Sequence, residues 1–208
     1  MKKFSLVFLV FIAAVSFQFA AVRSFAADAD LVIEDMEKPV VAGPEGTVDF
    51  GAGNGSSVEV VSSSDVKYSG DKAIKITFNA VPGGYMYVAK GDKLDAKNAS
   101  WQVSSQDIKW DEYKAISFYM YGSDSKARVA IDIKDKGNEI WRYIIQDNFT
   151  GWKKIVCNFS DFTARSDWQP NDAEKDAVLA FPITSFQFEP LPESKGTIYI
   201  DKVELIKK

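Results

Sequence analysis

Short apolar–polar alternations, separated by turn residues, recur along most of this chain and limit the folds that it can adopt. Ile116, Phe118 and Met120, for example, occupy every second position before a turn at Gly122. This spacing is typical of a strand that buries one face. It predicts strands at 31–37, 57–61, 73–79, 85–89, 114–121, 128–135, 140–146, 152–159, 183–189 and 196–205. Residues 42–55 are rich in glycine and are predicted to be loop and turn around a short segment at 47–50. With one short helix at 172–179, the chain is predicted to be an all-β jelly-roll β-sandwich of two antiparallel sheets.

The last of these strands contains a fault in its alternation. Ile198 and Ile200 share one face, whereas Val203 falls on the opposite phase. A strict period of two would expose one set of these apolar residues to water. We therefore predict a β-bulge at Asp201 and Lys202, which restores the phase and redirects the carboxylate at the break.

The first 26 residues are predicted to be a secretory signal peptide. Lys2 and Lys3 precede an apolar run at 4–22, and small residues at 24 and 26 indicate cleavage after Ala26. The alternative for this segment is an uncleaved membrane anchor. If it is cleaved, residues 27–208 form a single domain that is secreted, periplasmic or at the cell surface, and the mature form has no membrane segment.

Charge and residue types exclude several classes of function. Without the three basic residues of the signal segment, the 29 acidic residues outnumber Lys and Arg by seven, so binding to nucleic acid or anionic membranes is not expected. The chain has no histidine, which rules out Ser-His-Asp, Cys-His and zinc–histidine sites. Cys157 is the single cysteine and shares a phase with Ile155 and Phe159, so we expect it in the core.

Five motifs follow one another in an order that matches a known family. They are Glu34–Glu37, Tyr68–Ile76, Trp110–Phe118, Gly151–Ile155 and Gly196–Asp201. On these motifs the chain resembles the family 11-like carbohydrate-binding modules, which are jelly-roll sandwiches of the galactose-binding-like type. The resemblance implies a non-catalytic module that binds polysaccharide.

The same resemblance implies a structural calcium ion. Its ligands in related modules come from the first strand, from a turn before an early strand and from the aspartate of the last strand. In this chain those positions are Asp35, Glu37, Ser69, Asp71 and Asp201. Calcium takes six to eight hard oxygen ligands, which carboxylates and carbonyls supply. The alternative is that these residues are solvated acids at strand ends.

Sugar binding requires aromatic rings that stack on pyranose faces and planar polar groups that bind hydroxyls. Trp141 and Tyr143 share one face of their strand and Arg142 the other, and either face could point outward. The tyrosines could instead serve only as good strand formers, and Trp110 and Trp152 are expected in the core. The candidate ligand-binding residues are Tyr85, Tyr87, Tyr119, Tyr121, Arg128, Asp132, Trp141, Tyr143, Trp168, Gln187 and Glu189, with Lys134 on the same predicted face as Asp132.

The function that these observations predict is a secreted, non-catalytic module that binds a polysaccharide such as β-glucan through an aromatic and polar sheet face. A protein-interaction or structural jelly roll at the surface or in the periplasm is the alternative. A glycan-active enzyme is less favoured. Glycosidases need two carboxyl groups, whereas the outward phases at Asp132 and Glu189 each supply one acid.

Overall fold

A computed structural model describes residues 29–208, so the predicted signal peptide at 1–26 lies outside the described residues. The strands and short 3₁₀ helices follow in chain order. They are β1 (Leu31–Glu34), β2 (Asp49–Gly53), β3 (Ser57–Ser63), β4 (Ala73–Ala80), β5 (Tyr85–Gly91), η1 (Ser105–Asp107), η2 (Trp110–Glu112), β6 (Tyr113–Ser123), β7 (Arg128–Lys134), β8 (Ile140–Gln146), β9 (Thr150–Asn158), η3 (Phe159–Asp161), β10 (Thr163–Ala164), β11 (Ser185–Pro190) and β12 (Ser194–Lys207).

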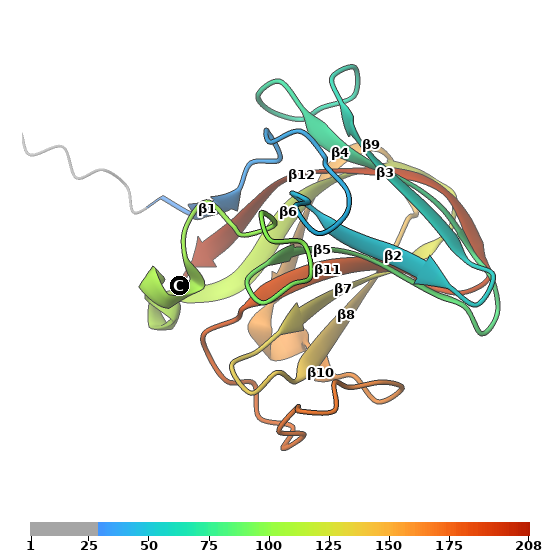
Figure 1. Ribbon diagram of the computed structural model, residues 1–208. Coiled ribbons are helices and arrows are strands. Elements are labelled where there is room, and N and C mark those ends of the chain that lie inside the picture. Colours follow the sequence, from blue (N-terminus) through green and yellow to red (C-terminus); the bar gives the residue numbers. More distant parts are fainter. Residues whose placement is uncertain (1–28) are drawn as a thin grey trace, which may run out of the picture.

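The strands form two antiparallel sheets that face each other (Figure 1). Sheet A has the order β3–β4–β12–β6–β9, with β1 also paired to β12, and sheet B has the order β10–β8–β7–β11–β5–β2. The prediction of an all-β jelly-roll sandwich is therefore confirmed. No helix within residues 29–208 has the length and apolar character needed to cross a membrane.

The helix predicted at 172–179 is wrong. The residues of this segment have mostly irregular backbone within the long connection between β10 and β11. Their backbone amides bind other parts of the chain, since Glu174 N donates to Gly137 O at 2.9 Å and Ala177 N donates to Glu139 Oε2 at 3.2 Å. Tertiary hydrogen bonds thus replace the local ones that a helix needs.

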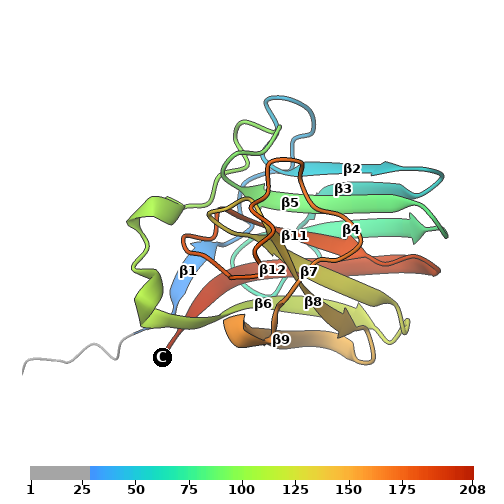
Figure 2. The ribbon, with the colours of Figure 1, turned by 90° about the horizontal axis from the view of Figure 1, so that it is seen from below.

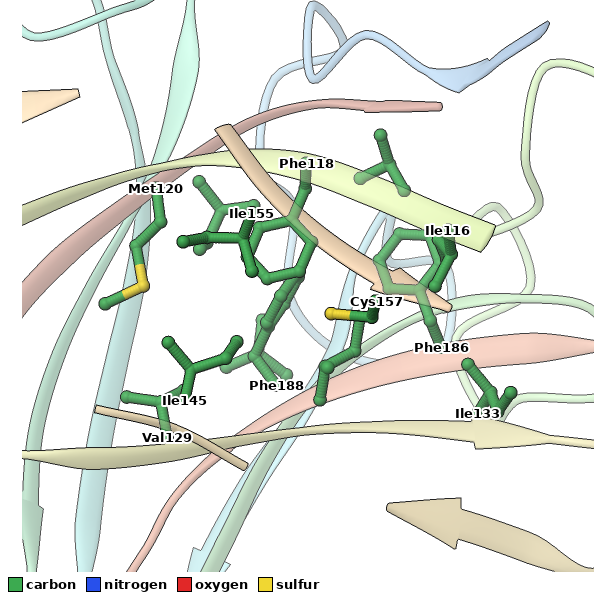
Figure 3. Close-up of a cluster of buried hydrophobic side chains, with 14 of the residues drawn as sticks. Ile116, Phe118, Met120, Val129, Ile133, Ile145, Ile155, Cys157, Phe186 and Phe188 are labelled. Atoms are coloured by element: carbon green, nitrogen blue, oxygen red, sulfur yellow. The ribbon is translucent and has the colours of Figure 1, made fainter. Parts of the chain in front are cut away.

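The core lies between the two sheets and is built from the inward phases of their strands. Figure 3 shows Phe118 and Met120 of sheet A pointing into the space between the sheets, where Phe186 and Phe188 of sheet B also lie. The rings of Phe118 and Phe188 meet edge to face, with centroids 4.9 Å apart. These four side chains are almost completely buried. The alternation read from the sequence therefore identifies the core face of these strands correctly.

The bulge predicted in the last strand is present. Asp201 pairs with Tyr119 of β6, but the next paired residue of β12 is Glu204, so the register shifts between them. Lys202 within the bulge has a positive φ of 43°. Ile200 and Val203 are buried on either side of it, as expected if an extra residue restores the phase.

Cys157 is fully buried among these side chains, which predicts an unreactive thiol. Burial raises its pKa to about 12, so almost no thiolate forms near neutral pH. We expect no reaction with dithionitrobenzoate in the native protein at about pH 8, and complete reaction of one thiol after unfolding in guanidinium chloride. Absorbance of the released thiolate measures both. Rapid labelling of the native protein would contradict this placement.

Candidate functional site

A groove of about 690 Å³ runs along the outer face of sheet B. Its floor comes from β5, β7, β8 and β11, and residues of the β10–β11 connection border it; Figure 2 shows this connection, in orange, crossing in front of the sheet. The residues predicted from the sequence that line the groove are Tyr85, Tyr87, Trp168, Gln187 and Glu189. Residues from three distant segments of the chain are thus brought together on one face.

Two tyrosines of β5 form an aromatic surface beside glycines of β2. Gly51 pairs with Tyr87 and Gly53 pairs with Tyr85 across the two strands. A Cβ atom at Gly51 would lie 3.2 Å from the Tyr87 ring, and one at Gly53 would lie 2.5 Å from the Tyr85 ring. The glycines therefore leave the space into which the rings extend. Burial, with the nearby carboxylate of Asp49, raises the pKa of Tyr87, so its hydroxyl remains neutral at physiological pH.

The polar floor beside these rings is an ion-pair network centred on Arg142. Its Nε and Nη2 atoms each lie 2.8 Å from an oxygen of Asp132, and Nη2 also lies 2.8 Å from Glu189 Oε2. Arg165 Nη1 lies 2.8 Å from the same Glu189 oxygen, and Gln187 Nε2 donates to Asp132 Oδ2 at 3.1 Å. Burial raises the pKa of Glu189 although both arginines act against it. The network holds the polar groups of the floor in fixed positions.

Trp168 stands on the β10–β11 connection and is 56% exposed. The guanidinium of Arg165 lies 5.8 Å from its ring centroid. The neighbouring Gln169 side chain pairs with the backbone of Ile140, accepting from its N–H at 2.7 Å and donating to its carbonyl at 2.8 Å. These contacts fasten the connection to the edge of β8. The exposed indole is therefore placed at the groove by a segment attached to β8.

Two predicted ligand residues lie on the opposite side of the molecule. Tyr119 and Tyr121 belong to β6 and point outward from sheet A, not from sheet B. There Tyr119 stacks on Tyr68 with ring centroids 3.5 Å apart, and Tyr121 meets Trp152 edge to face at 5.5 Å. Their assignment to the same face as the β5 tyrosines is wrong, because alternation does not reveal which sheet a strand joins. Trp152 also lies on this outer face, contrary to the expected core position.

In β8, Trp141 and Tyr143 were predicted to bind sugar, but both point inward. Trp141 is 7% exposed and its Nε1 donates to Asp135 Oδ2 at 3.3 Å. Tyr143 packs on Phe162, with ring centroids 5.8 Å apart. Trp141 is thus unavailable to a ligand, and the outward residue between them is Arg142.

Arg128 is exposed at the start of β7. With Tyr143 it borders a second hollow of about 570 Å³, which shares Arg165 with the main groove. Neither Arg128 nor Tyr143 lines the groove that holds the tyrosines of β5.

Sequence reasoning missed three residues of the site, namely Asp49, Arg142 and Arg165. For Arg142 the signal was present, since its strand had two possible outward faces. Asp49 precedes glycines in a segment whose pairing with β5 is not local. Arg165 lies in an aperiodic connection, and no sequence pattern there predicts that its charge reaches the groove.

The residues predicted to hold calcium converge in part. Asp201 is fully buried at the bulge, and its Oδ2 accepts hydrogen bonds from Tyr68 N at 2.7 Å and Ser69 N at 3.0 Å. Glu37 Oε1 accepts a hydrogen bond from Asp71 N at 2.9 Å. Two carboxylates from the beginning and end of the fold therefore meet on one turn.

The other predicted calcium ligands take different positions. Asp35 Oδ1 accepts from Glu37 N at 3.1 Å, and the Asp71 side chain is exposed. Burial raises the pKa of Asp201, and this effect exceeds the lowering by the turn amides that donate hydrogen bonds to it. Within residues 29–208, no three acidic or cysteine side chains are grouped closely enough to hold a metal. Of the predicted ligands, the two carboxylates Glu37 and Asp201 bind the same turn, and carboxylate oxygens are ligands that calcium accepts.

Comparisons with known proteins connect this geometry to a family. A model described as "Carbohydrate binding domain (family 11)" matches residues 20–208. The family 11 carbohydrate-binding module of the cellulosomal cellulase Lic26A-Cel5E of Clostridium thermocellum has the same fold, with a TM-score of 0.65 at 22% identity over 88% of this chain and 97% of that module. A Clostridium thermocellum family 11 module in complex with a β-1,3-1,4-mixed-linked tetrasaccharide matches with a TM-score of 0.63 at 21% identity, over 87% and 98%.

A curated relative is larger. A mannan endo-1,4-β-mannosidase of Bifidobacterium adolescentis is 27% identical over 124 residues, which make up 60% of this chain but 11% of that enzyme. The chain thus matches about a tenth of the length of this relative. Since the family model covers both sheets and the groove, the chain belongs to the family 11 carbohydrate-binding domains.

Proposed function

We propose that this protein binds β-glucan chains in the groove on the outer face of sheet B and performs no chemistry on them. The observation that carries the proposal is the placement of Tyr85, Tyr87 and Trp168 around one groove above a fixed polar floor. Aromatic rings stack on the apolar faces of sugars, and the ordered polar groups bind hydroxyls. The mixed-linked tetrasaccharide in the related Clostridium thermocellum module supports the choice of β-glucan.

The proposed absence of catalysis follows from the pairing of the floor carboxylates. Asp132 is 1% exposed and lies beneath Arg142, which binds both of its oxygens. Glu189 is held by Arg142 and Arg165. A glycosidase needs one carboxyl group to protonate the glycosidic oxygen and another to attack or activate water. Carboxylates neutralised by guanidinium groups are poorly suited to either role.

Affinity electrophoresis tests the proposal. We expect mixed-linkage β-1,3-1,4-glucan in the gel to retard the protein, and we expect no release of reducing sugar from the same polysaccharide. Free migration in glucan, xylan and mannan gels would refute polysaccharide binding and favour a protein-interaction domain. Release of reducing sugar would instead refute the non-catalytic part of the proposal.

The proposed location is outside the cytoplasm, as a secreted, periplasmic or cell-surface protein. The proposed ligand, a β-glucan polysaccharide, is extracellular. The apolar segment at 4–22 also has the composition of an export signal. N-terminal sequencing of the protein exported by its host provides the test. A mature chain that begins at Ala27 is expected, whereas retention of the first 26 residues would contradict cleavage.

We also propose that calcium stabilises the fold through Glu37 and Asp201. Saturating calcium is expected to raise the Tm of the wild type by about 4–10 °C relative to chelator, which corresponds to about 2–3 kcal/mol at 100-fold excess over Kd. Differential scanning calorimetry measures the shift. Asp201→Asn keeps the size of the side chain and removes its charge, so this variant should lose the calcium response. An identical Tm for the wild type in calcium and in chelator would exclude the site.

A further inference from the structure

The buried charges in the floor of the groove pair with one another, but a partly buried lysine beside them has no partner in the described part of the chain. Arg142 binds Asp132 and Glu189, and Arg165 binds Glu189. Lys134, the next outward residue of β7 after Asp132, lines the same groove and is partly buried. Within residues 29–208 its ammonium makes no hydrogen bond or ion pair. Since an unpaired charge removed from water is costly, this ammonium is poised to take its partner from a ligand.

The strand neighbours of Lys134 carry no charge. Its register partners are Ile140 on β8 and Ser185 on β11, and Ser185 in turn pairs with Gly91 on β5. These neighbours are apolar or small, so none of them competes for the ammonium or covers it. Trp168 lines the groove together with Lys134. The indole and the ammonium therefore face the same groove, so one bound glycan can contact both.

The charges around Lys134 indicate which ligand suits it. Burial is the main influence on its pKa and lowers it. Three carboxylates and one ammonium act on it from the surrounding elements, so the local field is negative and does not attract an acidic ligand. These groups are Asp172 on the β10–β11 connection, Asp49 on β2, and Lys93 and Asp95 in the loop after β5.

We propose that Lys134 selects neutral sugars by donating charge-assisted hydrogen bonds from Nζ to the hydroxyl oxygens of the unit that stacks on Trp168. The inference rests on the proposed function and adds to it a named donor. An ammonium has three N–H donors and no acceptor, and sugar hydroxyl oxygens accept such bonds. The arginines of the floor are already occupied by carboxylates, which leaves two lysines of the groove, Lys93 and Lys134, for the ligand. Lys93 is exposed on a loop, whereas Lys134 is partly buried on the sheet itself.

Calorimetric titration with mixed-linkage β-1,3-1,4-glucan tests this role in the wild type, Lys134→Met and Lys134→Arg. At about pH 7 we expect Lys134→Met to bind about tenfold more weakly or worse, and Lys134→Arg to bind nearly as well as the wild type. The ammonium is present below its pKa and lost above it. Raising the pH to about 9.5 should therefore weaken the wild type but not Lys134→Arg, whose guanidinium stays charged. Tyr87 remains neutral over this range because its pKa is raised.

The outcomes that overturn this inference differ from those that overturn the proposed function. Equal affinity of the wild type and Lys134→Met would overturn the role of Lys134 alone, as would one pH profile shared by the wild type and Lys134→Arg. Binding of polygalacturonate that depends on Lys134 would overturn the selection of neutral sugars. No binding of the wild type to any neutral polysaccharide would overturn both. Matching Tm values for the three proteins show that the substitutions leave the fold intact.

Discussion

Replacing Trp168 with alanine should weaken the binding of mixed-linkage β-glucan by about tenfold or more. The indole is 56% exposed and held at the groove, so a sugar can cover it without any rearrangement of the β10–β11 connection. Aromatic stacking is worth about 0.5–1.5 kcal/mol in addition to the burial of apolar area, and tenfold in affinity corresponds to about 1.4 kcal/mol. Calorimetric titration of the two proteins measures the difference.

Trp152→Ala is the matched control for this substitution. It makes the same chemical change on the outer face of sheet A, where Trp152 contacts Tyr121 and Tyr68. We expect its affinity to equal that of the wild type, although its Tm should fall because these aromatic contacts are lost. If Trp152→Ala weakened binding as much as Trp168→Ala, the glycan would lie on sheet A or on both faces, and the groove would lose its assigned role.

Replacing Arg142 with methionine should destabilise the fold strongly. Arg142 binds both oxygens of Asp132, a carboxylate that is 1% exposed, and it shares Glu189 and one Asp132 oxygen with Arg165, whose contact with Asp132 is longer at 3.3 Å. Removing one partner of a buried ion pair costs about 3–5 kcal/mol, because the remaining charge stays buried. In a domain of this size the expected fall in Tm is about 6–20 °C. Thermal unfolding followed by circular dichroism measures it.

Two further variants show whether the fall in Tm comes from the unpaired buried charge or from lost side-chain packing. Lys97→Met breaks an exposed ion pair with Glu45, and such pairs contribute about 0–1 kcal/mol, so its Tm should change little. Adding Asp132→Asn to Arg142→Met removes the stranded charge and should recover part of the lost stability. A Tm for Arg142→Met within about 2 °C of the wild type would show that the network is not a structural support.

Local pattern was sufficient to predict the strands and the core. Alternation depends only on which side of a strand faces the partner sheet, so Phe118 and Phe188 could both be placed in the core before any pairing was known. The bulge at Asp201 was predictable for the same reason, since two buried sets on opposite phases require an extra residue between them.

The membership of each face was harder to predict, because it depends on pairing between distant strands. Tyr87 and Tyr119 have the same outward phase, yet β5 joins sheet B and β6 joins sheet A. The residue types of β8 did not decide which of its faces is outward, since either Trp141 or Arg142 could face water. Burying Arg142 beside Asp132 is favourable only in the presence of that carboxylate, which lies on a different strand. Such choices are made by tertiary contacts, which no local window contains.

The position of β12 has a consequence for how the chain folds. These 14 residues follow all the other strands of sheet A in the sequence, yet they lie between β4 and β6 and also pair with β1. Until β12 is in place, β4 and β6 each lack a neighbour and sheet A cannot close. The sandwich can therefore be completed only after β12 has been synthesised, and a deletion within β12 would open the middle of a sheet rather than trim its edge.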